Sequence, residues 1–289
     1  MPTSTVKQNL IGQLPDPVAK QRHPWRIISG ILVVIATIFV AYGLWSNQAL
    51  DHDTIGRYLT HDNIMSGLKN TIVLALISMA IGVVGGFIFA LMRLSENPVL
   101  RAIGFAYVAI VRSIPLLLLI LFVGNISLFW SGVDILNPIT KEVWFSWDTN
   151  DLITPFVASV IALSVNEAAY MAEIIRSGIS SVDEGQREAA DALGLGPFRT
   201  MTRVILPQAL RVIIPPTGSQ FITMIKMTSL VSVIAGGDLL TEAQNIAAIN
   251  LRTLELLLVA FLWYFAVTGI ATIGQTILER RLARGQRKG

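Results

Sequence analysis

Four ionisable side chains interrupt long apolar stretches of this 289-residue chain: Arg112, Glu167, Glu173 and Lys226. An ionised side chain at the centre of a bilayer costs about 2.5–3.5 kcal/mol on insertion scales, so residues of this kind usually serve a function. We expect Glu167 and Lys226 to lie deep in their stretches. Arg112 and Glu173 are expected near the cytoplasmic ends, and together with Pro115 they are candidates for a structural or gating role. An acid and a base in such a setting suit the ammonium and carboxylate of a zwitterion.

Polar residues recur at helical spacing in two of these stretches: Asn166, Tyr170 and Glu173 in one, and Ser219, Thr223 and Lys226 in the other. Residues three or four positions apart share one face of a helix. Pro215 and Pro216 lie in the second stretch and are expected to interrupt its helix. Together with Glu167, these polar residues are candidates to line a pathway for a solute. Hydrogen bonding between helices would explain the same pattern, so both interpretations stay open.

The residue types that enzymes use for covalent, metal or nucleotide chemistry are missing or scattered. There is no cysteine, which excludes disulfides, thiol catalysis and cysteine-based metal sites. No lysine follows a glycine, so the phosphate-binding Walker loop is absent. His52 and His61 stand among acidic residues, where a solvated loop is expected rather than a metal site. The sequence predicts no catalytic residue and no metal site, and the chain is not expected to be an enzyme.

The composition is that of a membrane protein. Charged residues make up 14% of the chain, against about 25% in soluble domains, and the mean hydropathy is +0.62. Residues 27–45, 70–92 and 256–278 contain no charged side chain and are long enough to cross a bilayer. Gly82 and Gly86, four residues apart, predict close packing against a neighbouring helix. These features exclude a soluble enzyme, a disordered chain and a disulfide scaffold.

We predict an all-α integral membrane protein with six transmembrane helices. The expected spans are residues 27–45, 70–92, 102–130, 152–175, 208–235 and 256–278. Basic residues concentrate on one side, because the loops of the other side, 46–67, 131–151 and 236–255, hold only Arg57, Lys141 and Arg252. By the positive-inside rule, both ends of the chain lie in the cytoplasm. The first span is expected to be a retained helix rather than a cleaved signal peptide.

The largest cytoplasmic loop, residues 176–207, carries signals for a helix–turn–helix between the fourth and fifth spans. Ser181 and Glu184 fit a capping box for a first helix that runs to Leu193. Gly194 is placed to end that helix in a left-handed conformation.

The second helix of this loop is expected to begin at Pro197, which suits a first turn, and to end before Pro207. Ala189, Ala190 and Leu193 of the first helix would form a compact face suited to a partner's groove. A solvent-facing linker is the alternative that the sequence leaves open.

At this point the chain resembles a known family. Glu188-Ala189-Ala190-x-x-x-Gly194, followed after nine residues by Val204-Ile205-Leu206-Pro207, resembles the EAA motif of the membrane subunits of ABC importers. Further segments resemble the polar amino acid permeases of that family: Arg112-x-x-Pro115, Tyr170-x-Ala-Glu173, Arg176-x-Gly178 and Lys226-x-Thr228-Ser229-Leu230. The resemblance covers roughly residues 64–280. Met227, Ser219 and Glu167 depart from the residues common among relatives, which leaves the class intact and the substrate open.

The resemblance implies a mechanism and a set of partners. Two membrane subunits, either two copies or this chain and a homologous sibling, would form the pathway in the bilayer. Each would rest its loop on a cytoplasmic ATPase dimer that binds ATP and Mg, and an extracytoplasmic binding protein would deliver the amino acid. The residues expected to transmit force are Glu188, Ala189, Ala190, Gly194, Leu195 and Pro207. No cofactor is expected on this chain, no nucleic acid is expected as a partner, and the bacterial inner membrane is the expected location.

The expected organisation follows from the spans and the resemblance. Residues 1–26 would be a flexible cytoplasmic tail, 27–45 an extra N-terminal transmembrane helix, 64–280 a five-span importer domain that includes the loop, and 281–289 a basic cytoplasmic tail. An ion-coupled secondary amino acid carrier is the alternative function. Such a carrier would need an ion-coupling site and usually internal repeats, and neither is evident in the sequence.

Overall fold

The computed structural model describes residues 24–47, 50–136, 140 and 143–286, and the predicted tail before residue 24 lies outside them. The chain divides into two units, residues 1–50 and 51–289. The first unit contains α1 (Pro24–Trp45), which covers the predicted first span. Ile31, Phe39 and most other described side chains of α1 are apolar and exposed. A helix with so apolar a surface is consistent with a bilayer environment.

The second unit carries the remaining elements, which are almost all helical. In chain order they are α2 (His52–Leu59), α3 (Asp62–Leu94), α4 (Pro98–Ser113), α5 (Leu116–Gly124), the 3₁₀ turn Ile126–Leu128, β1 (Gly132–Leu136), β2 (Val143–Asp148), α6 (Thr149–Leu152), α7 (Pro155–Ser180), α8 (Glu184–Ala192), α9 (Pro197–Thr200), a π-helical turn Met201–Ile205, α10 (Leu206–Met227), a 3₁₀ stretch Thr228–Ile234, α11 (Leu239–Asn250) and α12 (Thr253–Gln286).

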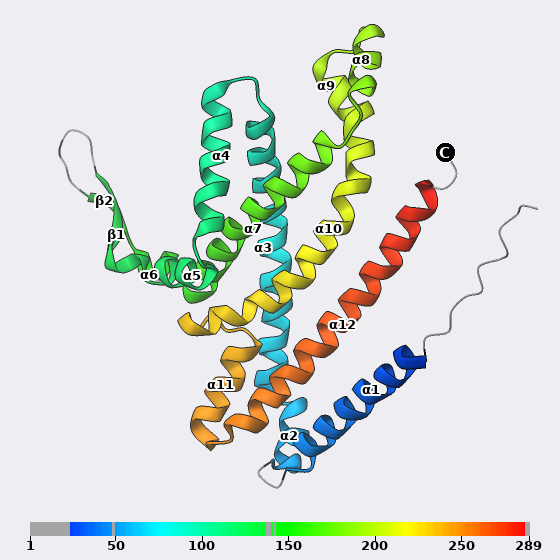
Figure 1. Ribbon diagram of the computed structural model, residues 1–289. Helices are drawn as coiled ribbons and strands as arrows, with labels where there is room; N and C mark the ends of the chain where they lie inside the picture. Colours follow the sequence, from blue (N-terminus) through cyan, green and yellow to red (C-terminus); the bar gives the residue numbers. More distant parts are fainter. Residues whose placement is uncertain (1–23, 48–49, 137–139, 141–142, 287–289) are drawn as a thin grey trace, which may run out of the picture. The chain divides into compact units, whose positions relative to one another are not determined.

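The pair α3 and α7 forms the centre of this unit (Figure 1). The two helices approach closely because small residues of α3 face α7. A Cβ atom on Gly82 would lie 2.6 Å from Cγ of Glu167, and one on Gly86 would collide with Cβ of Met171. Such contacts admit glycine alone, so the predicted packing role of Gly82 and Gly86 is confirmed. α8 and α9 lie beyond the ends of α7 and α10, whereas α11 lies at the opposite end of the unit (Figure 1).

Among the described residues, three helices are each long and apolar enough to cross a membrane, namely α3, α7 and α12, and up to five crossings result if two bent helix pairs each count as one. The first bent pair covers residues 98–124 and so overlaps the span predicted over residues 102–130, but as two helices rather than one. α4 and α5 meet at 97°. The cause is Pro115, which holds the preceding Ile114 in an extended conformation (φ −90°, ψ 127°) and ends α4 there.

The second bent pair corrects one further prediction, the interruption of the helix at Pro215 and Pro216. α10 continues through Pro215 and Pro216 without a break, and the side chain of Gln275 in α12 donates to the carbonyl of Pro215 (3.3 Å). Neighbouring helices of membrane proteins often satisfy backbone groups near proline in this way. The chain bends instead by 43° after Ile234, where Ala235 (φ 54°) and Gly237 (φ 76°) are left-handed.

The predicted outer loop 236–255 is in fact mostly the helix α11. Asp238 caps it by accepting from the backbone N–H of Leu240 and Thr241. Leu239, Ala243, Ile246 and Ala247 are buried and pack with residues of α2, α3 and α12, so this face has the spacing of an amphipathic helix. A second element that the sequence did not predict is the antiparallel hairpin of β1 and β2, in which Gly132 pairs with Asp148.

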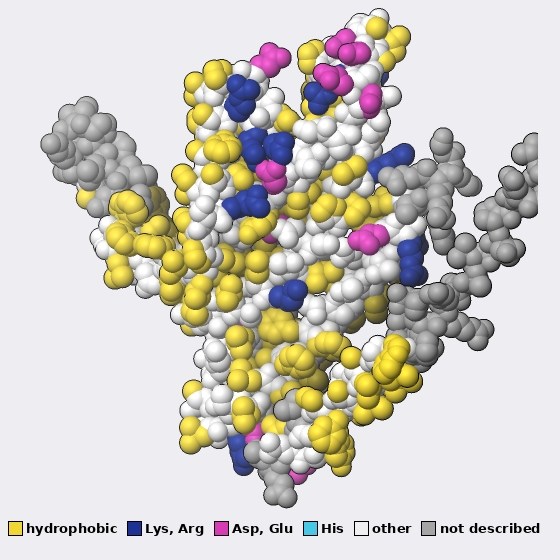
Figure 2. Space-filling view, in the orientation of Figure 1, with side chains coloured by type: hydrophobic (Ala, Val, Ile, Leu, Met, Phe, Trp, Pro, Cys, Tyr) yellow, Lys and Arg dark blue, Asp and Glu magenta, His cyan; other side chains and the backbone are white. Residues whose placement is uncertain are grey.

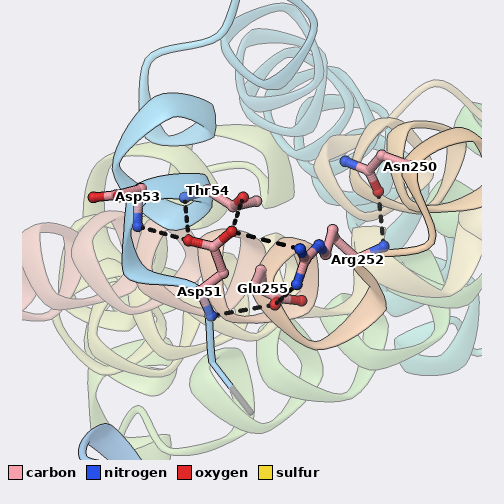
Figure 3. Close-up of polar contacts among 6 residues, drawn as sticks. All are labelled: Asp51, Asp53, Thr54, Asn250, Arg252 and Glu255. Atoms are coloured by element: carbon pink, nitrogen blue, oxygen red, sulfur yellow. Dashed lines mark hydrogen bonds and ion pairs between the residues drawn. The ribbon is translucent and has the colours of Figure 1, made fainter. Parts of the chain in front are cut away.

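A polar cluster ties α2 to the start of α12 at the α11 end of the unit (Figure 3). Asp51 accepts from the backbone N–H and the hydroxyl of Thr54 and thereby caps α2. Arg252 lies 3.7 Å from Asp51 and 3.5 Å from Glu255, and the backbone N–H of Asp51 donates to Glu255. The hydrogen bonds from Thr54 lower the pKa of Asp51 from its ordinary value of 3.8, and the positive charge of Arg252 adds to this effect.

Candidate functional site

The turn between α8 and α9 has the geometry of a Schellman motif. The backbone N–H of Leu195 donates to the carbonyl of Ala190 (3.0 Å), and that of Gly194 donates to the carbonyl of Asp191 (2.9 Å). Gly194 has φ +73°, so the predicted left-handed end of the helix is confirmed. The position is open to solvent, because a Cβ on Gly194 would meet nothing within 4 Å. Backbone conformation, rather than space, is therefore what requires glycine.

The start of α8 differs from the predicted capping box. Asp183 is the N-cap, and its carboxylate accepts from the backbone N–H of Gly185. Ser181 instead ends α7 and donates its hydroxyl to the carbonyl of Gly178 (2.7 Å). The N-cap of α8 therefore lies two residues later than predicted, and an aspartate is an equally good cap.

The second helix of the loop does not end before Pro207, contrary to the prediction. α9 passes through the π-helical turn Met201–Ile205 into α10, and Pro207 lies in the first turn of α10. The backbone N–H of Leu206 donates to the carbonyl of Met201, five residues back. This wider turn relieves the clash that a proline ring makes in a regular helix. Consequently the loop is continuous with the transmembrane helix α10.

The exposed surface of the loop is partly apolar. Glu188 and Ala189 are exposed, as predicted for a contact face, but Ala190 is only 3% exposed and packs inward, so its place on that face was wrong. Leu193 and Phe198 are 80% and 79% exposed. Phe198 was missed because it lies in the second helix, outside the motif.

The turn is also braced from inside. Leu195 is half-buried, and its carbonyl accepts from the hydroxyl of buried Thr200 (3.4 Å). The amide of Gln208 in α10 donates to the amide oxygen of Gln186 in α8 (3.2 Å). These bonds connect α9 to the turn and α10 to α8, behind an exposed apolar tip.

Glu173 forms ion pairs with two arginines, one on the neighbouring helix α3 and one on α7 itself. Arg93 at the end of α3 contacts one carboxylate oxygen, and Arg176 lies 2.5 Å from the other. The Arg112 guanidinium lies over the ring of Tyr170, 5.2 Å from its centroid. Arg93, which sequence reasoning did not single out, is the basic residue that ends an apolar stretch, and that position was its only signal.

These residues border an open pocket of about 380 Å³ lined by Arg93, Phe105, Val108, Ala109, Arg112, Ser113 and Glu173. Arg112 was expected near the inner start of a span. It lies instead in the last turn of α4, about 21 Å along the helix from Pro98 at 1.5 Å per residue. The expectation failed because α4 begins earlier than predicted and ends at the bend, with Pro115 as the N-cap of α5.

Glu167 and Asn166 do not face an open path. Glu167 is 2% exposed, lies between α3 and α7, and its Oε1 has no hydrogen-bond partner among the described residues. Asn166 is 4% exposed. No ion pair joins Glu167 to Lys226 within the described part of the chain. The polar face predicted on α7 is therefore turned inward, toward α3 and α4.

The polar face predicted on α10 is open. Ser219 and Lys226 are exposed and Thr223 is half-buried. The amide of Gln275 in α12 donates to the Ser219 hydroxyl oxygen (2.7 Å) and to the carboxylate of Glu279 (2.8 Å). Sequence reasoning missed Gln275, although its spacing from Thr268, Thr272 and Glu279 is helical.

Comparison with known proteins agrees with this architecture. The family model described as "Binding-protein-dependent transport system inner membrane component" matches residues 82–284. The chain is 39% identical over 275 residues to the arginine transport system permease protein ArgU of Corynebacterium glutamicum, with 94% of this chain and 85% of that relative covered. It is 34% identical over 220 residues to the probable glutamine ABC transporter permease protein GlnM of Bacillus subtilis, with 76% of this chain and 93% of that relative covered.

A solved structure described as an amino acid ABC transporter with histidines has the same fold. Its TM-score is 0.68 at 33% identity, with 80% of this chain and 99% of that chain covered. The family match extends over well more than half of the sequence and includes α7, the α8–α9 turn, α10 and most of α12. The chain belongs to the family of inner membrane components of binding-protein-dependent transport systems.

Proposed function

We propose that this chain is the transmembrane subunit of an ATP-driven importer of polar amino acids. The observation that carries the proposal is the α8–α9 turn, which presents Leu193 and Phe198 to a partner and is continuous with α10. A force applied to this tip reaches the membrane-spanning part without an intervening flexible joint. Relatives named as arginine and glutamine permeases support an amino acid as the transported solute.

The partner at this tip is a cytoplasmic ATPase dimer, which holds ATP and Mg. The contact with the ATPase is formed by four residues of α8 and the turn that follows it: Glu188, Ala189, Gly194 and Leu195. Ala190, which is buried, and Pro207, in the first turn of α10, support them. A second permease subunit, identical or homologous, completes the pathway, and an extracytoplasmic binding protein delivers the solute. The proposal assigns both chain ends to the cytoplasm, because the loops of that side hold most of the basic residues.

Lys226, Thr223 and Ser219 are the pathway residues that the geometry favours. Their exposure in a membrane-spanning helix requires a polar environment, because a lysine ammonium in lipid is costly. Arg112, Tyr170 and Glu173 serve as a brace around the α4–α5 bend. Asn166 and Glu167 come to face the solute only if α3 and α7 separate during transport.

Purification of the tagged chain from its native membrane in mild detergent tests this function, followed by reconstitution of the eluted complex in proteoliposomes with its binding protein. The expected result is an ATPase that co-purifies in stoichiometric amount. Uptake of radiolabelled amino acid should require ATP on the side of the membrane where the ATPase lies. A chain that elutes alone and moves amino acid along an ion gradient would replace the importer with the secondary carrier.

A further inference from the structure

The polar side chains of α10 and α12 form one continuous column along two adjacent helices. Gln275 joins the two helices, because its amide donates to the Ser219 hydroxyl oxygen and to the Pro215 carbonyl. The close approach is set by Gly218, where a Cβ would lie 3.2 Å from Cγ of Gln275. The column starts at Lys226, passes Ser219 and Gln275, and ends at Glu279.

The order of charges along the column follows from the antiparallel course of the two helices. Lys226 is seven residues, or about 10 Å, beyond Ser219 on α10, and Glu279 is four residues, or about 6 Å, beyond Gln275 on α12. α10 starts at the α8–α9 turn and α12 runs back toward that end (Figure 1). Glu279 therefore lies on the side of the turn, and Lys226 lies farther from it.

Both charged ends of the column lack a partner of opposite charge among the described residues. The Lys226 ammonium has no ion pair or hydrogen bond among the described residues, and Glu279 is exposed with no basic partner there. Charged and amide groups do not stay in contact with lipid, so either water or a polar solute covers them. Figure 2 shows hydrophobic side chains over much of the middle of the face in view, with most of its charged side chains gathered toward α8 and α9. Ser219, Lys226 and Gln275 lie within the expected spans and Glu279 lies just after the end of one, so the column marks a pathway that opens on the side of the α8–α9 turn.

We infer that Gln275 and Glu279 of α12 line the cytoplasmic part of the solute pathway and favour amino acids with a positively charged side chain. The Glu279 carboxylate accepts hydrogen bonds only, and the Oε1 of Gln275 has no donor among the described residues, so both present acceptors. An ammonium or guanidinium group donates to acceptors, and such charge-assisted bonds are the strong ones. Lys226, about 16 Å from Glu279 along the two helices, suits the α-carboxylate of a solute farther along the same path. This inference rests on the proposed function.

The test measures uptake of arginine and of glutamine by proteoliposomes that contain the whole importer with its ATPase and binding protein. The substitution Glu279→Gln removes one negative charge and keeps the shape of the side chain. We expect it to lower the ratio of arginine to glutamine uptake about tenfold, as for loss of one charge-assisted hydrogen bond, and to leave ATP hydrolysis stimulated by the loaded binding protein unchanged. Glu96→Gln makes the same chemical change in the exposed loop before α4 and is expected to leave the ratio unchanged.

A second variant keeps the inference testable if Glu279→Gln fails to assemble. Gln275→Glu replaces the amide, which donates to Ser219, by a carboxylate that accepts from the Ser219 hydroxyl, and it is expected to raise the same ratio. Equal loss of both substrates, or an unchanged ratio in either assembled variant, would overturn the role of the column. Wild-type importer that takes up glutamine but no arginine would also overturn it while sustaining the proposed function. Wild-type complex that takes up none of the polar amino acids would remove the proposed function itself.

Discussion

The polar faces of α7 and α10 have the same spacing in the sequence and opposite environments in the structure. Tyr170 and Glu173 of α7 are held by Arg112, Arg93 and Arg176. Ser219 and Lys226 of α10 are exposed, with Gln275 as the one described contact of their side chains from another helix. Polar residues along one face of a membrane-spanning helix can thus either link neighbouring helices or line a solute pathway. Ion-pair partners, rather than spacing, distinguish the two.

The largest effect that separates the two faces is expected from Lys226→Met. The substitution keeps the length of the side chain and removes a charge that makes no ion pair within the described residues. Amino acid uptake by the reconstituted importer should fall at least about tenfold, as for loss of one strong charge-assisted bond to the solute, while the melting temperature in detergent stays within about 2 °C. A large loss of thermal stability with normal uptake would make the α10 face a brace as well.

The matching change on α7 is Glu173→Ala, which leaves Arg93 and Arg176 without their carboxylate. Removing one partner of a buried ion pair costs about 3–5 kcal/mol. Because the Glu173 side chain is 33% exposed, we expect about 2 kcal/mol after screening by solvent. The measurement is thermal unfolding followed by fluorescence-detected size-exclusion chromatography. If stability is unchanged and uptake is abolished, Glu173 lines the pathway instead of linking the helices.

A third substitution tests whether solute transport along these faces depends on the α8–α9 turn. Gly194→Ala meets no neighbouring atom, so its only cost is the left-handed backbone, about 1 kcal/mol. We expect uptake to fall severalfold while the ATPase still hydrolyses ATP, measured in the same proteoliposomes. Gly196→Ala is the matched control, because Gly196 has φ −69° and equally open surroundings. Equal effects of the two substitutions would refute the role of the left-handed turn.

The smallest expected effect concerns Asp51, far from both faces. Its pKa is lowered in the folded chain, so its contribution to stability is present above its ordinary pKa of 3.8 and is lost as the pH falls through the folded value. Wild type should therefore melt slightly higher than Asp51→Asn at pH 7, and the difference should shrink below pH 4. The check is a pair of melting curves at each pH. A difference that grows on acidification would contradict the capping role.

Much of the fold was predictable because it rests on local signals. Charge-free stretches located α3 and α12, and glycine located the end of α8, since no other residue adopts that backbone without strain. The failures came where neighbours decide the outcome. Pro215 and Pro216 predicted a break in the helix, but α12 supplies a donor to the Pro215 carbonyl. The π-helical turn before Pro207 accommodates that proline in the same continuous helix.

The candidate site was predictable only in part, for a similar reason. The sequence placed Glu167 on a polar path because an acid in an apolar stretch is unusual, yet Gly82 of α3 packs against its stem and buries it. Whether a polar residue faces inward or outward depends on which helix lies beside it. Gln275 was missed because its importance lies in a bond to α10, about 60 residues earlier in the chain.

The central claim, that the α8–α9 turn rests on an ATPase, is tested most directly by site-specific cross-linking. The chain has no cysteine, so Leu193→Cys supplies a single thiol at the exposed tip. A thiol-directed photo-crosslinker on native membranes is predicted to give an adduct of the permease with an ATPase subunit. Val99→Cys, at the exposed start of α4, is predicted to give none. Absence of an ATPase adduct from Leu193→Cys, or an equal yield from both positions, would contradict the account.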